Sequence, residues 1–181
     1  MTLKPKGRKP PDLGPVARVE AVRLSPAGDE KGLNAIIGDA GLSGPARDGL
    51  LKHGTDPSTM WQGPSTPGLK IEFDLSQPVS LAAVQVWNFN ADWQTGNGIR
   101  KADVAVSADG STWQTLLSGA EFAEAEGTAD YDTPAVLKLN GALARKVRFE
   151  NIVPWTSSGK VGLSKVVFHQ APDSSRRAQA R

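Results

Sequence analysis

The sequence predicts an all-β protein, an antiparallel sandwich of about eight short strands. Apolar and polar residues alternate in several short segments between residues 17 and 170, as half-buried strands require. Turn-forming residues separate most of these segments. The only segment with helical spacing is 119–127, which is long enough for no more than a turn or two.

The clearest strand is predicted at residues 69–75, "LKIEFDL", where apolar side chains alternate strictly with charged ones. Weaker alternation predicts the remaining strands at 17–25, 79–89, 101–107, 112–118, 135–140, 145–152 and 162–169. Asp109-Gly110 and Asn140-Gly141 are dipeptides that favour tight turns. Residues 26–66 form a long Gly/Pro/Ser/Asp-rich loop, and a loop of that size within a domain is usually functional or tied down.

The chain of 181 residues suits one domain with tails. We expect a basic, proline-rich linker at 1–16, the sandwich at 17–170 and a polar basic tail at 171–181. The overall charge is +2, but residues 1–18 carry +4 and residues 171–181 carry +2, so residues 19–170 carry −4. A nucleic-acid binder needs a basic stripe on its folded part, and this distribution argues against one.

The chain shows neither an export signal nor a membrane span. No run approaches the roughly 18 apolar residues that cross a bilayer, and the N-terminus lacks the apolar stretch of a secretory signal. The absence of cysteine excludes disulfides and thiolate chemistry and suits either side of a membrane. Either a cytosolic protein or a piece of a longer secreted chain fits these observations.

The sequence predicts that the protein is not an enzyme. His53 and His169 are the only histidines, and no nucleophile elbow, zinc-binding pair or phosphate-binding loop is present. An acidic cluster offers a carboxylate pair of the kind used in glycoside hydrolysis, but its simpler interpretation is a solvated loop. Its members are Glu121, Glu124, Glu126, Asp130 and Asp132.

The five tryptophans are more informative than the ionisable residues. Trp87 and Trp113 belong to predicted strands and are expected in the core, while Trp61 ends the long loop and is expected to pack it down. Trp93, in "NADWQTG", and Trp155, in "NIVPWTSSGK", lie between strands among polar residues. Each is either folded back over the end of the sandwich or exposed to bind a ligand.

An exposed indole is a natural platform for a sugar, whose C–H face stacks on the ring while amides and charged groups bind the hydroxyls. We therefore predict a ligand site with Trp93 as the platform and Trp155 as a second wall. The candidate hydroxyl partners are Asn90, Asn97 and Arg100. Alternatively, Arg100 forms an ion pair with Asp92 or Asp103.

The order of segments resembles the discoidin family, also called the coagulation factor 5/8 type C domain, whose galactose-binding-like members include the family 32 carbohydrate-binding modules. The similarity covers roughly residues 17–170 and looks closest to members from large secreted proteins of planctomycete-like bacteria. It is carried by "ARDGLLKHGTDPSTMW", "LKIEFDLSQPVSLAAVQVWNFN", "GIRKADVAVSADGSTWQTLL", "EFAEAEGTADY" and "ARKVRFENIVPWTSSGKVGLSKVVF".

The resemblance implies an eight-stranded jelly roll without catalysis, which binds ligands through loops at one end. It also implies a place in a larger multidomain protein and an extracellular, periplasmic or cell-surface location.

The resemblance further implies a structural calcium ion, held by an A-x-D-G loop, a threonine of T-x-W and a glutamate of G-L-S-E. Asp48-Gly49 and Thr59 match the first two elements, but Lys165 stands where the glutamate is expected. Calcium takes 6 to 8 oxygen ligands, and an ammonium at this place removes one and adds a positive charge. The alternative to calcium is that Lys165 itself bridges oxygens of the long loop.

The leading hypothesis is a non-catalytic carbohydrate-binding module that attaches a parent enzyme or surface protein to a glycan or polysaccharide. The alternative is a protein-interaction, adhesion or spacer module without sugar binding, because a fold does not fix a function. Membrane binding calls for exposed apolar spikes beside basic residues. The polar neighbours of Trp93 argue against membrane binding there. Trp155 has Val153 and Lys160 nearby, so its sequence surroundings do not decide the question.

Overall fold

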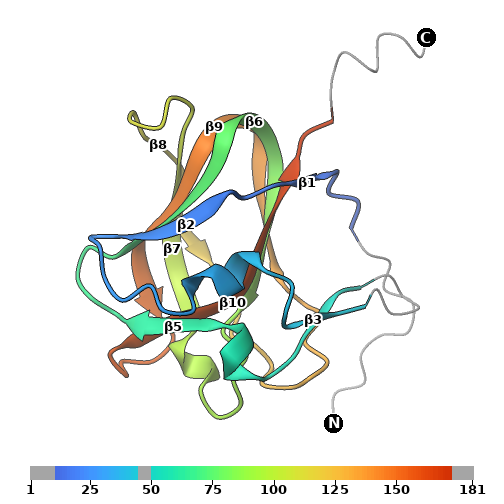
Figure 1. Ribbon diagram of the computed structural model, residues 1–181, viewed down its shortest axis with the longest axis vertical. Coiled ribbons are helices and arrows are strands. Elements are labelled where there is room, and N and C mark those ends of the chain that lie inside the picture. Colours follow the sequence, from blue (N-terminus) through green and yellow to red (C-terminus); the bar gives the residue numbers. More distant parts are fainter. Residues whose placement is uncertain (1–10, 45–49, 173–181) are drawn as a thin grey trace.

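The computed structural model describes residues 11–44 and 50–172 (Figure 1). Ten strands and three short 3-10 helices make up this part of the chain. In order they are β1 (Val16–Ala17), β2 (Ala21–Ser25), η1 (Leu33–Ile37), β3 (Leu42–Ser43), β4 (Lys52–His53), η2 (Pro57–Thr59), β5 (Trp61–Pro64), β6 (Lys70–Asn88), η3 (Thr95–Asn97), β7 (Ile99–Ser107), β8 (Gln114–Glu121), β9 (Ala135–Pro154) and β10 (Lys160–Gln170).

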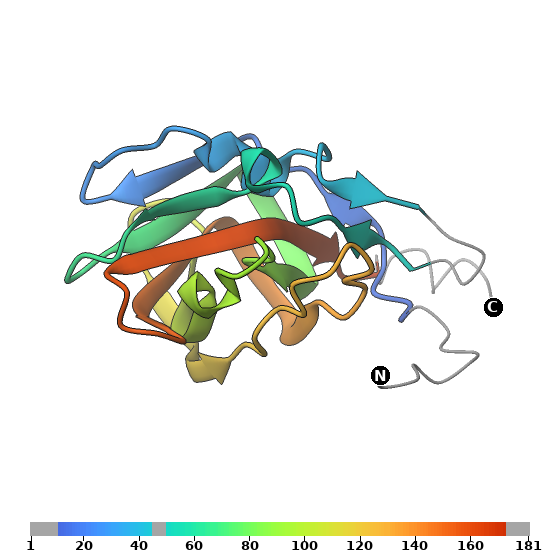
Figure 2. The ribbon, with the colours of Figure 1, turned by 90° about the horizontal axis from the view of Figure 1, so that it is seen from below.

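The large sheet is antiparallel throughout and has the order β1-β10-β6-β9-β7-β8, with β2 on β6 and β5 on β10. Because β6 and β9 are 19 and 20 residues long, each contributes to both layers of a sandwich. The start of β6 pairs with β2 and with the end of β9, whereas the end of β6 pairs with β10 and with the start of β9. Figure 2 shows β10 crossing the molecule beside β5. The predicted all-β jelly-roll sandwich is confirmed.

Two of the predicted breaks between strands are bends within single strands. The segments predicted at 69–75 and 79–89 join as β6, which bends at Ser76 with φ of 64°. The segments predicted at 135–140 and 145–152 join as β9, where Asn140 and Gly141 have φ of 53° and 77°. The Asn140-Gly141 dipeptide therefore turns a strand from one layer into the other instead of closing a hairpin. These bends form the arch at the top of Figure 1.

The core lies between the two layers and is built on phenylalanine. Phe73 contacts Phe149 and Phe168 edge to face, with ring centroids 5.3 and 5.2 Å apart, and all three are fully buried. Burying one such side chain contributes roughly 1.5–3 kcal/mol. The apolar face of the 69–75 segment supplies Ile71, Phe73 and Leu75 to this core, as its alternation predicted.

The helical turn predicted at 119–127 is wrong. Strand β8 continues to Glu121, and the residues after it have no helical structure. Phe122 and Ala125 are both buried, so the apolar spacing that resembles a helix comes from an extended loop packing two residues inward. The long 26–66 loop contains the two 3-10 helices η1 and η2 and the small β3-β4 sheet.

The ends of β10 mark the two ends of the sandwich. Its first residues lie beside the end of β6, and its last residues pair with β1, where the Gln170 amide donates to the Pro15 carbonyl at 2.7 Å. At about 3.3 Å per residue, the six steps of β10 from Leu163, beside Asn88, to His169, beside Val16, separate these places by about 20 Å. The two predicted basic tails lie mostly outside the described residues.

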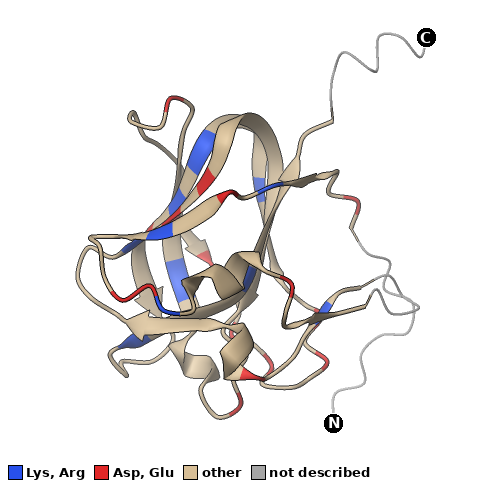
Figure 3. Ribbon diagram, viewed as in Figure 1, with Lys and Arg blue, Asp and Glu red and all other residues tan. Residues whose placement is uncertain are grey.

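Charged side chains are spread over the described part of the molecule (Figure 3). Lys and Arg lie mainly on the strands, whereas several Asp and Glu lie in the loops of the end that carries η2 and η3. Over residues 11–44 and 50–172 no helix has the length and apolar character needed to cross a membrane.

Candidate functional site

Loops from distant parts of the sequence meet at the end of β6. The Asn90 side chain, which follows β6, contacts both the loop before η2 and the loop between β8 and β9. The turn around η3 is joined to the β9-β10 loop, because the Thr156 amide donates to the Gly96 carbonyl at 2.9 Å. Four chain segments therefore form one connected surface at this end of the sandwich.

Trp93 lies on the most exposed turn of this surface. The turn spans Ala91 to Gln94 and is closed by a 3.0 Å hydrogen bond from the Gln94 amide to the Ala91 carbonyl. The Trp93 residue is 95% exposed, and its φ of 63° lies in the left-handed region. For a bulky side chain that conformation is a genuine outlier, and such outliers concentrate at functional sites. Of the two alternatives for Trp93, the structure shows the exposed one.

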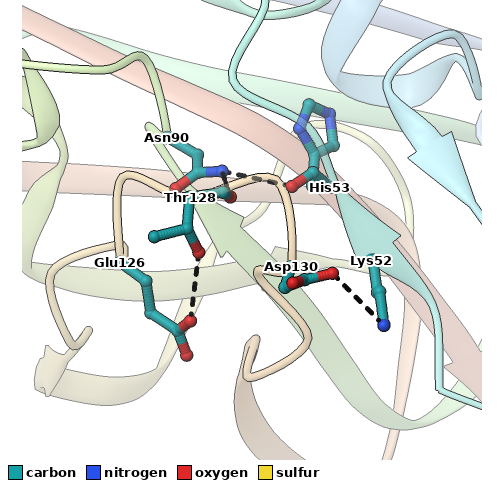
Figure 4. A network of polar contacts seen from close by, with 6 residues as sticks. All are labelled: Lys52, His53, Asn90, Glu126, Thr128 and Asp130. Atoms are coloured by element: carbon teal, nitrogen blue, oxygen red, sulfur yellow. Dashed lines mark hydrogen bonds and ion pairs between the residues drawn. The ribbon is translucent and has the colours of Figure 1, made fainter. Parts of the chain in front are cut away.

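Asn90 is not a hydroxyl partner, contrary to the prediction. It is completely buried, and its Nδ2 lies within 3.1 Å of the carbonyls of His53, Gly54 and Thr128 (Figure 4). Its Oδ1 accepts from the Gly127 amide at 2.8 Å. A buried amide must satisfy its donors and acceptor within the protein, and this one ties three chain segments together beneath the Trp93 turn.

Asn88 has the same structural role two residues earlier. Its Nδ2 donates to the carbonyls of Ile99 and Ala123, and its Oδ1 accepts from the amides of Phe89 and Ile99. A Cβ added to Gly98 would lie only 2.4 Å from this Oδ1, so the glycine of the "GNG" sequence makes room for the Asn88 amide. Asn88 and Asn90 therefore build the loop rather than line a ligand site.

Asn97 is also turned inward, which is a second correction to the predicted site. It is 8% exposed, and its Oδ1 accepts a short hydrogen bond from the Ser158 hydroxyl. The bond joins η3 to the β9-β10 loop alongside the Gly96–Thr156 contact. Asn97 therefore holds the position of that loop and has little surface left for a sugar.

Trp155 and Arg100 lie together at the same end of the sandwich. Trp155 is 38% exposed, and its Nε1 donates to the Phe122 carbonyl at 3.1 Å. The Arg100 guanidinium carbon lies 5.5 Å from the centroid of the Trp155 ring, within the range of a cation–π contact. The predicted second wall is thus a ring whose edge is fixed and whose face carries an exposed arginine.

The alternative ion pairs of Arg100 do not form within the described ranges. Asp103 instead accepts from the Asn151 side chain at 2.8 Å and from the Gly119 amide at 2.6 Å. These two hydrogen bonds lower the pKa of Asp103. With no ion pair to a carboxylate of the described residues, the exposed Arg100 guanidinium is available to a ligand.

Sequence reasoning missed the polar groups that do flank the Trp93 turn. Gln94 is exposed, and its Oε1 lies 3.4 Å from the Nε2 of Gln62, which follows Trp61 at the end of the long loop. The Thr95 hydroxyl donates to the Glu124 carboxylate at 2.7 Å. Gln94 adjoins Trp93 in the sequence and was open to prediction, but Gln62 and Glu124 reach the turn only through the fold.

The other tryptophans have structural positions. Trp87 is 1% exposed and lies in the core as expected, and Trp61, also 1% exposed, packs the end of the long loop inward. The prediction that Trp113 lies in the core is wrong: it is only half-buried and covers the outer face of the sheet, where the Arg148 guanidinium carbon lies 4.1 Å from its ring centroid. The Arg148 Nε lies 2.9 Å from a Glu150 oxygen, as an ion pair rather than a well-aligned hydrogen bond.

Lys165 binds the long loop directly. Its Nζ donates to the carbonyls of Ile37 and Gly38 at 3.0 and 2.7 Å and to the Asp39 carboxylate at 3.1 Å. Lys165 is only 5% exposed, so its ammonium is held by three oxygens and largely shielded from water.

Around Lys165 the described residues fit an ammonium rather than a calcium ion. Asp48 and Gly49 of the predicted site lie outside the described residues. The Thr59 hydroxyl donates to the Asp56 carbonyl at 2.7 Å, and the Lys165 ammonium holds the oxygens that face it. No group of three or more His, Asp or Glu that could hold a metal occurs within 11–44 and 50–172.

The ionisable groups at this end of the molecule serve the structure. His53 is 1% exposed, its Nδ1 lies 3.0 Å from the Gly54 carbonyl, and burial lowers its pKa. Burial also raises the pKa of Tyr131 to about 12, and its hydroxyl accepts from the Asn88 amide at 3.0 Å. Neither side chain presents an acid or base that is poised near neutral pH.

Comparison with solved structures places the fold among carbohydrate-binding modules. The CBM32 of AlyQ in complex with 4,5-unsaturated mannuronic acid is 17% identical, with 86% of this chain and 98% of that chain covered and a TM-score of 0.57. A pectin-binding carbohydrate-binding module is 16% identical, with 87% and 94% covered and a TM-score of 0.57. CpGH89CBM32-5 from Clostridium perfringens, in complex with GalNAc-β-1,3-galactose, is 16% identical, with 86% and 99% covered and a TM-score of 0.55.

Some structural neighbours contain such a module together with other domains. A truncated AlyQ with CBM32 and alginate lyase domains is covered over 34% of its length. The modules themselves are non-catalytic, in agreement with the prediction that this chain is not an enzyme. No curated protein matches the sequence.

The family comparison covers most of the described residues. The family described as "F5/8 type C domain" matches this chain over residues 43–166, from β3 through most of β10. This range contains the Trp93 turn, the Trp155–Arg100 pair and Lys165. The chain therefore belongs to the F5/8 type C domain family.

Proposed function

We propose that this domain is a non-catalytic carbohydrate-binding module that holds a sugar ring against Trp93. Its ligand surface is the set of loops at the end of β6, on the opposite end of β10 from β1. The fold of the family and its carbohydrate-binding structural neighbours support this proposal.

The observation that carries the proposal is the conformation of Trp93. The residue is 95% exposed, so its indole ring gains no stabilisation from burial in the protein. Its left-handed backbone conformation costs a bulky residue of the order of 1–2 kcal/mol. Beneath it, the Asn90 amide fixes the start of the turn through contacts to two other segments. A rigid base under an exposed ring is the arrangement that pre-organises a stacking platform.

Polar groups beside Trp93 and beside Trp155, at the same end of the sandwich, would give a sugar its hydroxyl partners. Gln94 and Gln62 present amides next to the turn, and Arg100 presents a guanidinium on the face of Trp155. An amide both donates and accepts, which suits hydroxyl groups, whereas a guanidinium only donates. These residues replace Asn90 and Asn97 in the proposed ligand surface.

We expect weak binding from a single site of this kind. One stacked ring with a few hydrogen bonds gives a Kd of roughly 0.1–1 mM. We propose that the module acts as part of a larger extracytoplasmic protein, which benefits from weak attachment to a repetitive polysaccharide through several simultaneous contacts.

A glycan array combined with affinity electrophoresis in polysaccharide gels tests the proposal. The intact domain is compared with Trp93→Ala and with the control Leu143→Ala, which removes an exposed apolar side chain near the bend of β9. Circular dichroism checks that all three proteins are folded. We expect the parent and the Leu143 variant to bind the same glycan and Trp93→Ala to bind it at least about 10-fold more weakly.

The opposite result has a defined meaning. If the folded parent binds no glycan in either assay, the carbohydrate proposal fails and the protein-interaction alternative takes its place. If it binds a glycan and Trp93→Ala binds equally well, the ligand surface is elsewhere. The exposed Val153–Trp155 segment of β9 and its following loop is then the next surface to vary.

A further inference from the structure

We propose that the Lys165 ammonium is a built-in substitute for a bound divalent cation, so that the loop after η1 keeps its structure without calcium. This inference does not rest on the proposed ligand site, because it concerns Lys165 and the loop after η1. The domain would then keep this loop in place without the calcium ion that its family resemblance implies.

The first step of the argument is the geometry of the ammonium. The three protons of an ammonium match the three oxygens of Ile37, Gly38 and Asp39, which lie at 3.0, 2.7 and 3.1 Å from Nζ. Two of these are backbone carbonyls, and the Lys165 ammonium is the donor that they share. A positive charge at this place is what holds the loop against β10.

The second step is the charge of the surrounding groups. Calcium takes 6 to 8 oxygens at 2.3–2.6 Å and favours carboxylates. Asp39 is the one carboxylate of the set, and its side chain is 89% exposed. A divalent ion beside the buried ammonium would meet like-charge repulsion with too few oxygens to offset it.

The third step comes from the sequence of the loop. The sequence alone matched the A-x-D-G pattern to Asp48-Gly49, but residues 35–38, Ala-Ile-Ile-Gly, share its alanine and glycine and have Ile37 in place of the aspartate. The structure shows that this segment, at the end of η1, supplies the oxygens opposite Lys165. Ile37 therefore brings no carboxylate to the oxygens around Lys165, and Lys165 itself brings an ammonium where the resemblance implied a glutamate.

The last step concerns access. Ile37, Asp39 and Lys165 line one surface groove with residues 16–19 of β1 and its flanks. A cation from solvent can therefore reach this position if two carboxylates are supplied there. The substitution is open to reversal by mutation.

The test measures the melting temperature of the intact domain in EDTA and in millimolar calcium, with calorimetric titration of calcium. We expect the melting temperature to be the same within about 1 °C and the titration to show no binding. If calcium raises the melting temperature of the parent protein by several degrees, the proposal is overturned. This measurement needs no variant.

Two variants sharpen the result. Lys165→Met leaves the Ile37 and Gly38 carbonyls without a donor, so we expect a loss of about 5 °C that calcium does not restore. Ile37→Asp combined with Lys165→Glu should gain calcium-dependent stability of at least about 5 °C. Lys160→Glu, at an exposed position of the same strand, controls for the change of charge. A folded double variant that gains no more from calcium than this control would show that the loop oxygens are not a cation site, and would overturn the substitution.

Discussion

The two tryptophan loops at the ligand end of the sandwich differ in how they are held. The Trp155 ring is tied by a hydrogen bond to the Phe122 carbonyl, is covered on one face by Arg100 and is 38% exposed. The Trp93 ring extends from a left-handed turn and is 95% exposed. Trp155 therefore stabilises the loops as well as belonging to the proposed ligand surface, whereas Trp93 belongs to that proposed surface alone.

The comparison extends to the residues just before Trp93. Asn88 and Asn90 are buried and have hydrogen-bond partners for both donors and acceptor, whereas Asp92, Trp93 and Gln94 are exposed. Within these seven residues, the side chains change from buried ones that hold the loop together to exposed ones that form its surface. Stability and binding should therefore respond to different residues of the same loop.

The largest expected effect is on stability, from Asn90→Ala. The change leaves buried carbonyls and the Gly127 amide without their partner, and we expect a loss of about 3 kcal/mol in the free energy of unfolding. Urea denaturation measures it, with Asn34→Ala at an exposed position as the control. A loss below about 1 kcal/mol would show that the Asn90 network does not hold the loops together.

An intermediate effect is expected from Trp155→Ala. The loss of the Nε1 hydrogen bond and of half-buried ring contacts should cost about 1–2 kcal/mol in the free energy of unfolding. Ligand affinity should fall as well, since the second wall is removed. If stability is unchanged while affinity falls, the Phe122 contact contributes nothing and Trp155 resembles Trp93.

A smaller effect is expected from pH, through His53 beside the Asn90 network. Burial lowers the pKa of His53 in the folded state, so the unfolded chain binds more protons just below pH 6.5. The stabilisation of the folded state by neutral His53 is thus complete above about pH 6.5 and is lost as pH falls toward the folded-state pKa. Between about pH 7.5 and pH 5.5, the free energy of unfolding measured by urea denaturation should fall more for the parent protein than for His53→Gln. Equal decreases would show that His53 is not the source of the pH dependence.

The smallest expected effect on stability comes from Trp93→Gly. Glycine adopts φ of 63° without strain, so the free energy of unfolding should stay the same or rise by up to about 1 kcal/mol. Glycan binding should be lost in the same variant. A decrease in the melting temperature of several degrees would mean that the Trp93 ring packs on the protein, and the contrast with Trp155 would fail.

The sequence allowed most of the fold to be predicted, because strands show their alternation locally. Ile71, Phe73 and Leu75 entered the core as their spacing indicated. The bend at Asn140 was not predictable, because the Asn140-Gly141 dipeptide suits a hairpin as well as a strand that turns between layers. The bend at Ser76 was not predicted either. The buried Phe122 and Ala125 gave helical spacing to a segment that has no helix.

The candidate site was predicted less well than the fold. The sequence indicated Trp93 because a large apolar residue is unusual in a polar loop. It could not distinguish Asn90 from Gln94, since an amide beside a turn is equally suited to a sugar hydroxyl and to a buried carbonyl, and only the fold decides. Gln62 reaches the turn from 31 positions away, so no local pattern could reveal it. Lys165 was identified as a departure, and the structure then showed which oxygens it contacts.

The pairing of β1 with the end of β10 determines how the domain transmits force. Whatever is attached at either end, a pull that separates the two chain ends opens the short β1 ladder first, because that ladder spans only Val16–His169 and Ala17–Phe168. The β6-β9 ladder and the Trp93 turn lie outside this path. Tension between neighbouring segments of a chain would therefore peel away two residues and leave the ligand end unloaded. A load applied through a bound polysaccharide, by contrast, would run along the full length of β6, β9 and β10, where many antiparallel hydrogen bonds resist shear together.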